Sequence, residues 1–567
     1  MTSGTDTGVH EVFDMSSEFV DRMAALRPSA ATYQGIPGHD GKWDDFSPAG
    51  GEEIVRFIQG YEKRLSALPK AADRWSELAM RVMADHLALE RTYYEDGDDM
   101  LDLNNIASTF QTIRQVFDIM DTGTPEGWSN VIQRVETIGK PLEGYRKTLE
   151  KGLAKNVTAS IRQTKAVIEQ SRVQAGPDSF YRRLPENMKA AGITDAALAA
   201  RLDAAIPVAC AAFAAFADWL ETTYLPKATP VDAAGRERYA RQTRRFLGMT
   251  IDPEETYRWG WSQLREIEAA MRDVAATINP GASVPEVFAL LKSDKSRAAR
   301  DIPDFVRIMT ERQMRALGDL DGKHFDIPDP VRRVEVKIAP RGGALGAYYI
   351  QPSEDFSRPG TVWYSLAPDE THDIPLYDHI STAYHEGFPG HHLQCAMQVY
   401  LSDHLSRLHR LSVWYPGYGE GWALYTERLM NELGYFEKPE YVLGMLNAQL
   451  FRACRVVIDI GCHLGLKVPM EETSFHPGET WNYELGVEMM EKRAFQDPQY
   501  ASSEVTRYLG WPGQAIAYKC GERVIMELRD ELKKRKGAAF DLKDFHQRVL
   551  GSGPVGLELL RELVLKD

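Results

Sequence analysis

The sequence has few cysteines, no excess of positive charge and no long apolar run, and each absence excludes a class of protein. Its five cysteines are odd in number and widely spaced, and none belongs to a paired metal-binding motif. Reduced thiols are typical of an intracellular protein, so we expect a cytoplasmic location. The cysteines are Cys210, Cys395, Cys454, Cys462 and Cys520.

The charge balance is acidic, with a formal net charge of −15. Nucleic acids and anionic membranes both bind basic surfaces, so we expect neither as a partner. No run of about 18 apolar residues predicts a membrane span. Residues 204–220 come closest, but Asp218 and several small residues favour a buried helix. Residues 1–8 are polar and lack the basic and apolar parts of a signal peptide.

A chain of 567 residues, 43% of them hydrophobic, exceeds the size at which one core usually stops growing, so we expect two lobes. Apolar residues recur at spacings of three and four along most of the chain, which predicts helices. Pro or Gly residues separate these segments. The clearest are residues 76–95, 127–154, 160–170, 195–224 and 253–277.

The pattern changes near residue 331, which divides the chain into a helical lobe of residues 1–330 and a second lobe of residues 331–567. Short β-like runs follow this point and predict a small sheet. Residues 342–349 could form a sheet edge that holds an extended peptide by strand addition. A sheet that only packs is the alternative. The β-like runs are residues 331–338, 347–351 and 360–365.

The most informative stretch is residues 384–394, with the sequence YHEGFPGHHLQ. Three of the chain's 14 histidines and a glutamate lie within eight positions, which indicates a metal site. A zinc peptidase usually has two histidine ligands one helical turn apart and a glutamate between them as general base. Here His385 and His391 are six residues apart, so an undistorted helix would place them on different faces.

Pro389 and Gly390 offer a way to bring these two rings together. Proline interrupts helical hydrogen bonding and glycine tolerates unusual backbone angles, so a break here could return His391 to the ligand face. His392 is the alternative ligand; it is nearly in phase with His385 but about 10 Å further along the helix axis. We favour His391, and we expect His392 to orient a ligand or to contact substrate. Glu386 is the expected general base.

Two histidines leave a catalytic metal site one protein ligand short. Glu420 follows a Pro-Gly turn at the start of a helical segment, and Glu427 lies seven residues later on the same face. We expect Glu420 to be the third ligand. Glu427 would orient a histidine ring through its free N–H. Two solvated helix glutamates are the alternative.

Arg455, Asp459 and His463 lie four residues apart within an apolar helical segment, which predicts a buried polar network. Each of these groups would need a partner, because an unpaired buried polar group costs roughly 1–3 kcal/mol. The network could face the metal site or could lock two helices together.

A late segment around a Pro-Gly turn, residues 507–519, brings further polar groups. Tyr518 is the expected donor to the oxyanion that forms during amide hydrolysis, with His463 as the alternative. Arg507 or Lys519 could pair with a substrate carboxylate, although solvation at the surface is the usual role of both. Gln514 adds a side-chain amide in the same segment and could also contact substrate.

Residues 385–394, with the pattern His-Glu-x-x-Pro-Gly-His-His-Leu-Gln, and residues 420–425, Glu-Gly-Trp-Ala-Leu-Tyr, resemble the bacterial domain-of-unknown-function family 885, whose members resemble zincin metallopeptidases. Weaker motifs extend the resemblance over nearly the whole chain. These are Tyr33-Gln34-Gly35, Asp44-Asp45-Phe46-Ser47, Gly235-Arg236-Glu237-Arg238-Tyr239 and Pro512-Gly513-Gln514-Ala515.

The resemblance implies a mainly α, zincin-like two-lobed fold with a small β-sheet beside a central channel, of which residues 1–330 form one wall. Such a fold is similar to angiotensin-converting enzyme, neurolysin and bacterial metallocarboxypeptidases. The resemblance also implies ligation by His385, His391 and Glu420, with Glu386 as base, and it supports a late-helix tyrosine, here Tyr518, as oxyanion donor.

The expected function is therefore a metallopeptidase that hydrolyses short peptides with a metal-bound water activated by Glu386. We expect one zinc ion, because imidazole and carboxylate ligands suit zinc best, although manganese, cobalt or iron would also be accepted. One alternative is a metal-dependent hydrolase of a non-peptide amide or another small molecule. The other is a non-catalytic binding protein on a peptidase scaffold.

Overall fold

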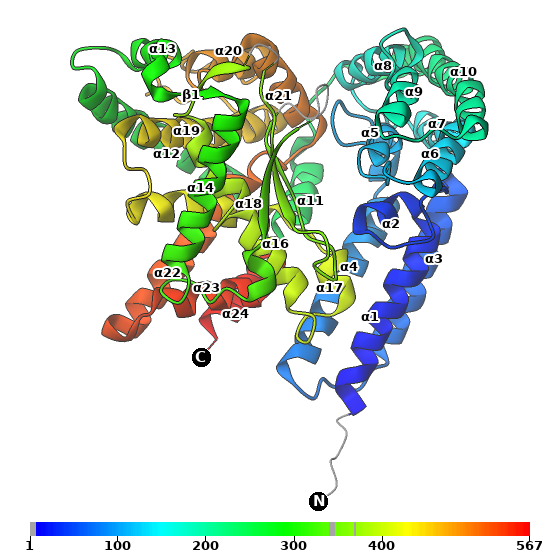
Figure 1. The fold of residues 1–567 in the computed structure, drawn as a ribbon, viewed down its shortest axis with the longest axis horizontal. Coiled ribbons are helices and arrows are strands. Elements are labelled where there is room, and N and C mark those ends of the chain that lie inside the picture. The colour runs from blue at the N-terminus through cyan, green and yellow to red at the C-terminus, as the bar shows by residue number, and fades with distance from the viewer. Residues whose placement is uncertain (1–6, 340–345, 368–369, 567) are drawn as a thin grey trace, which may run out of the picture. The chain divides into compact units, whose positions relative to one another are not determined.

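The computed structural model describes residues 7–339, 346–367 and 370–566, and it is mainly helical, as predicted (Figure 1). The chain forms two compact units. The first contains Met1–Asp232 with Ser406–Ser412 and Leu509–Trp511, and the second contains Ala233–Leu405, Val413–Tyr508 and Pro512–Asp567. The change in sequence pattern near residue 331 therefore lies inside the second unit.

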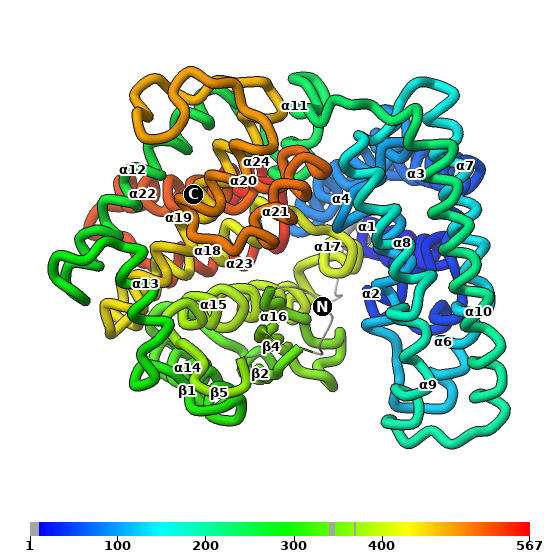
Figure 2. Tube along the Cα trace, turned by 90° about the horizontal axis from the view of Figure 1, so that it is seen from above, coloured from blue at the N-terminus to red at the C-terminus, as the bar shows by residue number. Residues whose placement is uncertain are grey.

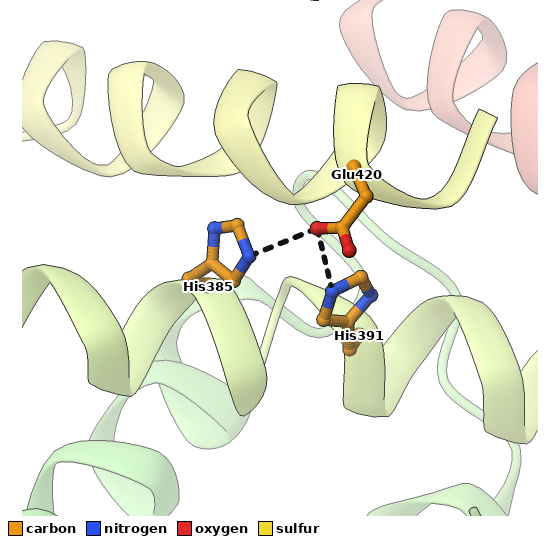
Figure 3. Close-up of side chains that lie close together, drawn as sticks. All are labelled: His385, His391 and Glu420. Carbon is orange, nitrogen blue, oxygen red and sulfur yellow. Dashed lines mark ion pairs between the residues drawn. The ribbon is translucent and has the colours of Figure 1, made fainter. Parts of the chain in front are cut away.

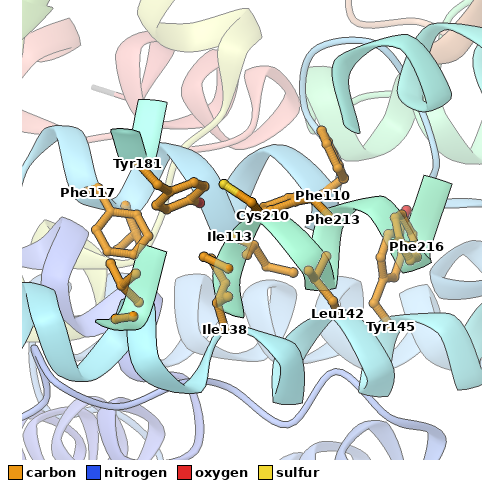
Figure 4. Close-up of a cluster of buried hydrophobic side chains, with 14 of the residues drawn as sticks. Phe110, Ile113, Phe117, Ile138, Leu142, Tyr145, Tyr181, Cys210, Phe213 and Phe216 are labelled. Carbon is orange, nitrogen blue, oxygen red and sulfur yellow. The ribbon is translucent and has the colours of Figure 1, made fainter. Parts of the chain in front are cut away.

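The first unit packs helices around an apolar core that is rich in aromatic rings (Figure 4). Phe213 of α10 lies 5.5 Å from the ring of Tyr181 and 5.8 Å from that of Phe110, measured between ring centres. The helices are α1 Thr7–Leu26, α2 Pro28–Gln34, α3 Pro48–Ser66, α4 Arg74–Glu95, α5 Thr109–Gln115, α6 Pro125–Thr137, α7 Gly139–Ala154, α8 Ile161–Ala175, α9 Phe180–Ala190, α10 Ala196–Trp219 and α17 Arg407–Leu411.

The predicted helices are present, and local signals set their ends. The segment predicted at 127–154 is two helices, α6 and α7, which meet at Ile138. α6 begins at Pro125 because proline fits the first helical turn and the side chain of Thr124 accepts a hydrogen bond from the N–H of Gly127.

Two helical segments are long and apolar enough to cross a membrane by length and composition, although the sequence has no unbroken apolar run of about 18 residues. Residues 196–227 include α10, which supplies Phe213 and Phe216 to the core of the first unit. The other is α19, which is buried over most of its length in the second unit. Core helices of globular proteins meet the same criteria.

The second unit contains the remaining helices and the strands. The helices are α11 Gly235–Leu247, α12 Pro253–Ile278, α13 Val284–Ser293, α14 Ile302–Leu320, α15 His379–Glu386, α16 His391–Tyr400, α18 Pro416–Glu432, α19 Pro439–Leu464, α20 Tyr483–Lys492, α21 Pro498–Gly510, α22 Ala517–Lys536, α23 Leu542–Gly551 and α24 Leu557–Leu565. The strands are β1 Ala298–Asp301, β2 Val334–Ile338, β3 Tyr348–Ile350, β4 Gly360–Tyr364 and β5 His372–Pro375.

The predicted small sheet is present, with strand order β2-β4-β3. β2 runs parallel to β4 and β3 runs antiparallel to it. β1 and β5 form a separate two-stranded sheet that the sequence did not predict. Of the edge predicted at residues 342–349, residues 342–345 lie outside the described residues, and β3 forms a described sheet edge. Peptide binding at that edge stays a prediction.

α15 and α16 follow one another beside β4, with α14 next to the same sheet (Figure 2). On the other side of the cluster described below, α18 packs closely on α22. A Cβ at Gly421 would overlap the backbone of Gly521, and a Cβ at Gly521 would overlap the carbonyl of Gly417. Small residues at this crossing therefore let α18, which carries two of the predicted site residues, lie directly against its neighbour.

Candidate metal centre

His385, His391 and Glu420 lie together in the second unit, with their side chains directed toward one another (Figure 3). Glu420 Oε2 lies 3.3 Å from His385 Nε2 and 3.3 Å from His391 Nε2. One ligand atom from each residue lies within 4.8 Å of the other two. The three residues come from three helices, α15, α16 and α18, so only the tertiary fold brings them to one point.

The unusual histidine spacing is explained by a break between α15 and α16. α15 ends at Glu386, and a new helix starts at His391, so the four intervening residues are not helical. A Cβ at Gly390 would overlap the carbonyl oxygens of His385 and Tyr384, and only glycine fits this tight return. The predicted interruption at Pro389 and Gly390 is therefore present, and the rings of His385 and His391 lie 5.0 Å apart between centres.

Two side chains from elsewhere in the unit hold this break in place. Gln313 of α14 donates to the carbonyl of Ala383 at 2.7 Å and accepts from the N–H of Phe388 at 2.6 Å. Trp422 of α18 donates its indole N–H to the carbonyl of Pro389 at 2.9 Å. Backbone groups that the break frees from helical bonding are thus satisfied, which stabilises the turn between the two histidines.

Glu427 fixes the orientation of the His385 ring. Its Oε1 lies 2.7 Å from His385 Nδ1, and its Oε2 accepts a hydrogen bond of 2.6 Å from Ser381. With Nδ1–H donated to Glu427, His385 presents Nε2 to Glu420. A carboxylate behind a histidine in this way sets the tautomer of a metal ligand and raises its basicity. This is the arrangement that the seven-residue spacing of Glu420 and Glu427 predicted.

The electrostatics of the cluster favour positive charge. Burial lowers the pKa of His385, but contacts with Glu420 and Glu427 outweigh it and raise the pKa to about 9. Burial likewise raises the pKa of Glu420, yet His385 and His391 hold it well below its usual value. The buried carboxylate of Glu427 and the half-buried one of Glu420 beside two imidazoles therefore create a place that would stabilise a cation.

The donor set fits a divalent metal ion. Glu420 Oε2 is buried and has no hydrogen-bond partner in the described part of the chain, although it lies 3.3 Å from both imidazoles. Donors bound to zinc at about 2.0–2.1 Å in a tetrahedral site are separated by about 3.3 Å. Two imidazole nitrogens and one carboxylate oxygen are also the set found in catalytic zinc sites that keep a fourth position open.

Glu386 directly follows His385 at the end of α15 and is half-buried. Its carboxylate makes no hydrogen bond or ion pair with the described residues. Burial raises its pKa, and the nearby charges of His385, His391 and Arg452 act in the opposite direction.

His392 is directed away from the cluster. Its Nε2 donates to the carbonyl of Val331 at 2.8 Å, and Nδ1 lies 3.0 Å from the hydroxyl of Tyr349 on β3. Burial lowers its pKa to about 4, so the ring is neutral. Both nitrogens of His392 are engaged within the chain, and His391, not His392, lies together with His385 and Glu420. A role of His392 in orienting a ligand or contacting substrate stays a prediction.

The predicted network on α19 exists, and the structure supplies its partners. Arg455 pairs with Glu504 at 2.8 Å, and Asp459 accepts bonds from Tyr239 and from the N–H of Gly513. Nδ1 of His463 accepts from the N–H of Ala234, while Nε2 donates to the carbonyl of Tyr508, each at 3.0 Å. The predicted role of His463 as oxyanion donor is not compatible with this geometry, because neither nitrogen is left for a substrate.

The late polar residues are also engaged within the chain. Lys519 pairs with Glu522 and donates to Gln449, and Arg507 bonds both Glu504 and Gln514. Neither cation therefore has the exposed, solvated role given as its alternative. Tyr518 is half-buried in the first turn of α22, with the guanidinium of Arg455 4.7 Å from its ring centre.

Two residues near the cluster were not singled out from the sequence. Trp414 is 45% exposed and its ring lies 6.1 Å from that of His391, so an accessible indole borders the cluster. A Cβ at Gly419 would overlap this indole, which explains the glycine beside Glu420. The second residue, Arg452 on α19, acts electrostatically on both Glu386 and Glu427. Its position within the network segment was visible, but its lack of a carboxylate partner among the described residues was not.

The fold and the cluster define a mainly helical protein with a buried His-His-Glu site. The chain belongs to the family described as "Bacterial protein of unknown function (DUF885)", which matches residues 28–564. No curated protein matches it.

Two solved structures share the fold. One, "the putative lipoprotein from Colwellia psychrerythraea", is 23% identical with a TM-score of 0.84, over 98% of each chain. The other, "a putative lipoprotein of unknown function from Shewanella oneidensis", is 21% identical with a TM-score of 0.72, over 97% of this chain and 99% of that one. At these identities the two structures establish the fold and assign no activity.

The expected cytoplasmic location is wrong. Both neighbours are described as lipoproteins, which contradicts it. The inference rested on five reduced cysteines, and all five are buried and free in the structure. Buried thiols pack as small apolar side chains, so their number carries no information on the compartment.

Proposed function

We propose that this protein is a metal-dependent hydrolase of short peptides, in which His385, His391 and Glu420 hold one divalent ion, zinc by preference. The observation that carries the proposal is the buried Glu420 Oε2, which has no hydrogen-bond partner among the described residues and lies 3.3 Å from two imidazole nitrogens. The zincin-like character of the fold and the choice of peptides belong to the same proposal. They are supported by the resemblance of residues 385–394 and 420–425 to family 885, whose members resemble zincin metallopeptidases.

A divalent ion held by these residues would lower the pKa of water and polarise a carbonyl group. Glu386 is the proton acceptor in this proposal, because it adjoins His385 and its carboxylate is not engaged by the described residues. Glu427 keeps the His385 ring in the tautomer that presents Nε2. Tyr518 remains the candidate donor to the oxyanion, since its hydroxyl forms no hydrogen bond with the described part of the chain.

The first test is metal analysis of the purified protein together with three variants. We expect about one zinc per chain in the unaltered protein and in Glu386→Gln. His391→Ala should lose it. His379→Gln is the matched control, because His379 lies on α15 outside the cluster, against Phe305, and its loss should leave the metal in place.

The second test is hydrolysis of a peptide library by the metal-loaded protein. We expect turnover of short peptides that Glu386→Gln reduces by about 10²–10⁴-fold, the usual contribution of a general base. Hydrolysis of amide-containing metabolites without peptide turnover would replace the peptidase by a small-molecule hydrolase. Absence of metal in every protein, even after zinc is supplied, would leave a non-catalytic binding protein.

A further inference from the structure

Arg452 is a half-buried arginine on α19 without a carboxylate partner among the described residues. Its Nη1 donates to the carbonyl of Ala448, one turn earlier on the same helix, at 3.2 Å. Its Nε is buried and has no hydrogen-bond partner. The guanidinium also lies over the ring of Phe451, 5.5 Å from the ring centre. None of these contacts neutralises its charge.

Neighbouring buried cations of the second unit are paired. Arg455, three residues later on α19, has Glu504 at 2.8 Å. Arg493 has Glu268 at 2.7 Å, and Lys519 has Glu522. A charge removed from water is costly unless a counter-charge and hydrogen bonds replace the lost solvation. Arg452 is half-buried and lacks, among the described residues, the counter-ion that each of these cations has.

The location of Arg452 connects it to the metal centre. α19 packs against α15, the helix that carries His385 and Glu386. A Cβ at Gly444 of α19 would overlap the carbonyl of Tyr377, which comes shortly before α15, and Arg452 lies about two helical turns further along α19. Arg452 pairs with no carboxylate, and its Nε has no acceptor, in the described part of the chain.

The guanidinium of Arg452 indicates what kind of group would be its partner. A guanidinium offers a rigid fork of N–H donors that matches a carboxylate in a bidentate contact. A short peptide bound at the metal centre carries such a group at its C-terminus. Arg507 and Lys519, the cations first considered for this role, already have acceptors inside the chain.

We propose that Arg452 binds the free C-terminal carboxylate of the substrate, which makes short peptides with a free C-terminus the substrate class of this site. The proposal rests on the function proposed above. Arg452 would act as a specificity residue that aligns the peptide beside the metal centre and takes no part in proton transfer.

The test compares N-acetyl-trialanine with its C-terminal amide, which differ only in the carboxylate. The unaltered, metal-loaded protein should prefer the free acid. Arg452→Gln should raise KM for the free acid by about 10- to 100-fold, the usual effect of removing one partner of a charged hydrogen bond. KM for the amide should change by less than about threefold, within the scatter of a surface substitution.

Arg452→Lys keeps the charge but loses the fork, so it should recover part of the preference. Arg315→Gln, which alters an exposed arginine of α14, is the matched control and should behave as the unaltered protein. An equal loss of kcat for acid and amide would mean that Arg452 only supports Glu386 electrostatically, and this would overturn the proposal. An unchanged ratio of the two substrates would overturn it as well.

Binding to inactive protein separates this inference from the proposed hydrolysis. Calorimetric titration of Glu386→Gln with the same two peptides, with and without Arg452→Gln, measures recognition in the absence of turnover. A preference for the acid that disappears with Arg452→Gln supports the carboxylate site even if no peptide is hydrolysed. Hydrolysis of peptides with no preference between acid and amide would reject the proposed role of Arg452 and would leave the proposed hydrolase function intact.

Discussion

Two buried polar clusters of the second unit contain similar residues but differ in how far the chain satisfies them. In the network on α19, His463 has a backbone partner on each nitrogen, and Asp459 accepts two hydrogen bonds. In the metal cluster, Glu420 Oε2 and His391 Nδ1 are buried without a hydrogen-bond partner. Arg455 Nη1 and Asp459 Oδ1 also lack one, but the other polar atoms of those two groups are engaged.

The difference teaches that residue type alone does not separate a structural network from a ligand site. A cluster saturated by its own chain joins helices, because each bond is already made within the fold. A cluster in which a buried carboxylate oxygen lies between two imidazole nitrogens without a formed hydrogen bond is costly unless a cation or another ligand completes it. The following predictions test this distinction.

The largest effect is expected from removal of a ligand. Glu420→Ala should lose the metal and all measurable hydrolysis, because two imidazoles alone form an incomplete site. Elemental analysis and peptide turnover measure both. Full metal content in this variant would contradict the assignment of the cluster.

The next largest effect is expected on kcat when the proposed general base, Glu386, is replaced. Glu386→Gln should retain the metal and reduce kcat by about 10²–10⁴-fold. Glu311→Gln, an exposed substitution on α14, serves as the control. If kcat of Glu386→Gln stays within a few fold of the unaltered value, another group must accept the proton.

A smaller loss of metal affinity is expected from substitution of Glu427, which orients the ligand His385. Glu427→Gln should weaken metal affinity by about 10- to 100-fold, because the amide no longer holds His385 as a carboxylate does. Competition with a chelator of known affinity measures the change. Ser381→Ala, which removes only the hydrogen bond to Glu427, should have a weaker effect in the same direction. Equal affinity in all three proteins would show that Glu427 does not act through His385.

Substitutions in the network on α19, whose hydrogen bonds are made within the chain, should lower the free energy of unfolding and leave the metal content unchanged. Asp459→Ala leaves the hydroxyl of Tyr239 and the N–H of Gly513 without their acceptor, at a cost of about 1–3 kcal/mol for each buried group. Denaturant unfolding measures this loss. Metal per folded molecule should be unchanged, and metal loss would place Asp459 in the site after all.

The smallest predicted effect is a pH dependence. Burial raises the pKa of Asp459 from 3.8 to about 7, so the folded protein retains a proton that the unfolded chain releases. The stability from this group is fully present below about pH 4 and is lost as the pH rises toward 7. Asp459→Asn, which cannot ionise, should gain stability relative to the unaltered protein over that range. A constant difference between the two unfolding curves would argue against a protonated Asp459.

Much of the site was predictable because spacing along the chain encodes local geometry. The interval between His385 and His391, with Pro389 and Gly390 inside it, predicted the helix break that the structure contains. Seven residues between Glu420 and Glu427 placed both on one face of α18. The helices and the small sheet followed from periodicity in the same way.

Other features depended on contacts between segments distant in sequence. Gln313 of α14 and Trp422 of α18 hydrogen-bond to the backbone around the break between α15 and α16. The spacing of residues in the motif does not predict these hydrogen bonds. The boundary between the two units at Asp232 was not visible either, because it reflects where contacts become sparse.

The sequence by itself determined which residues could bind a metal, because ligand types and helical phase are properties of short segments. Only the tertiary structure decided which polar groups are already satisfied: His463, Arg507 and Lys519 are engaged, whereas Glu420 and Arg452 retain unpartnered atoms. The physical reason is that a hydrogen bond or ion pair joins two groups, and the second group comes from an element that the first segment does not specify.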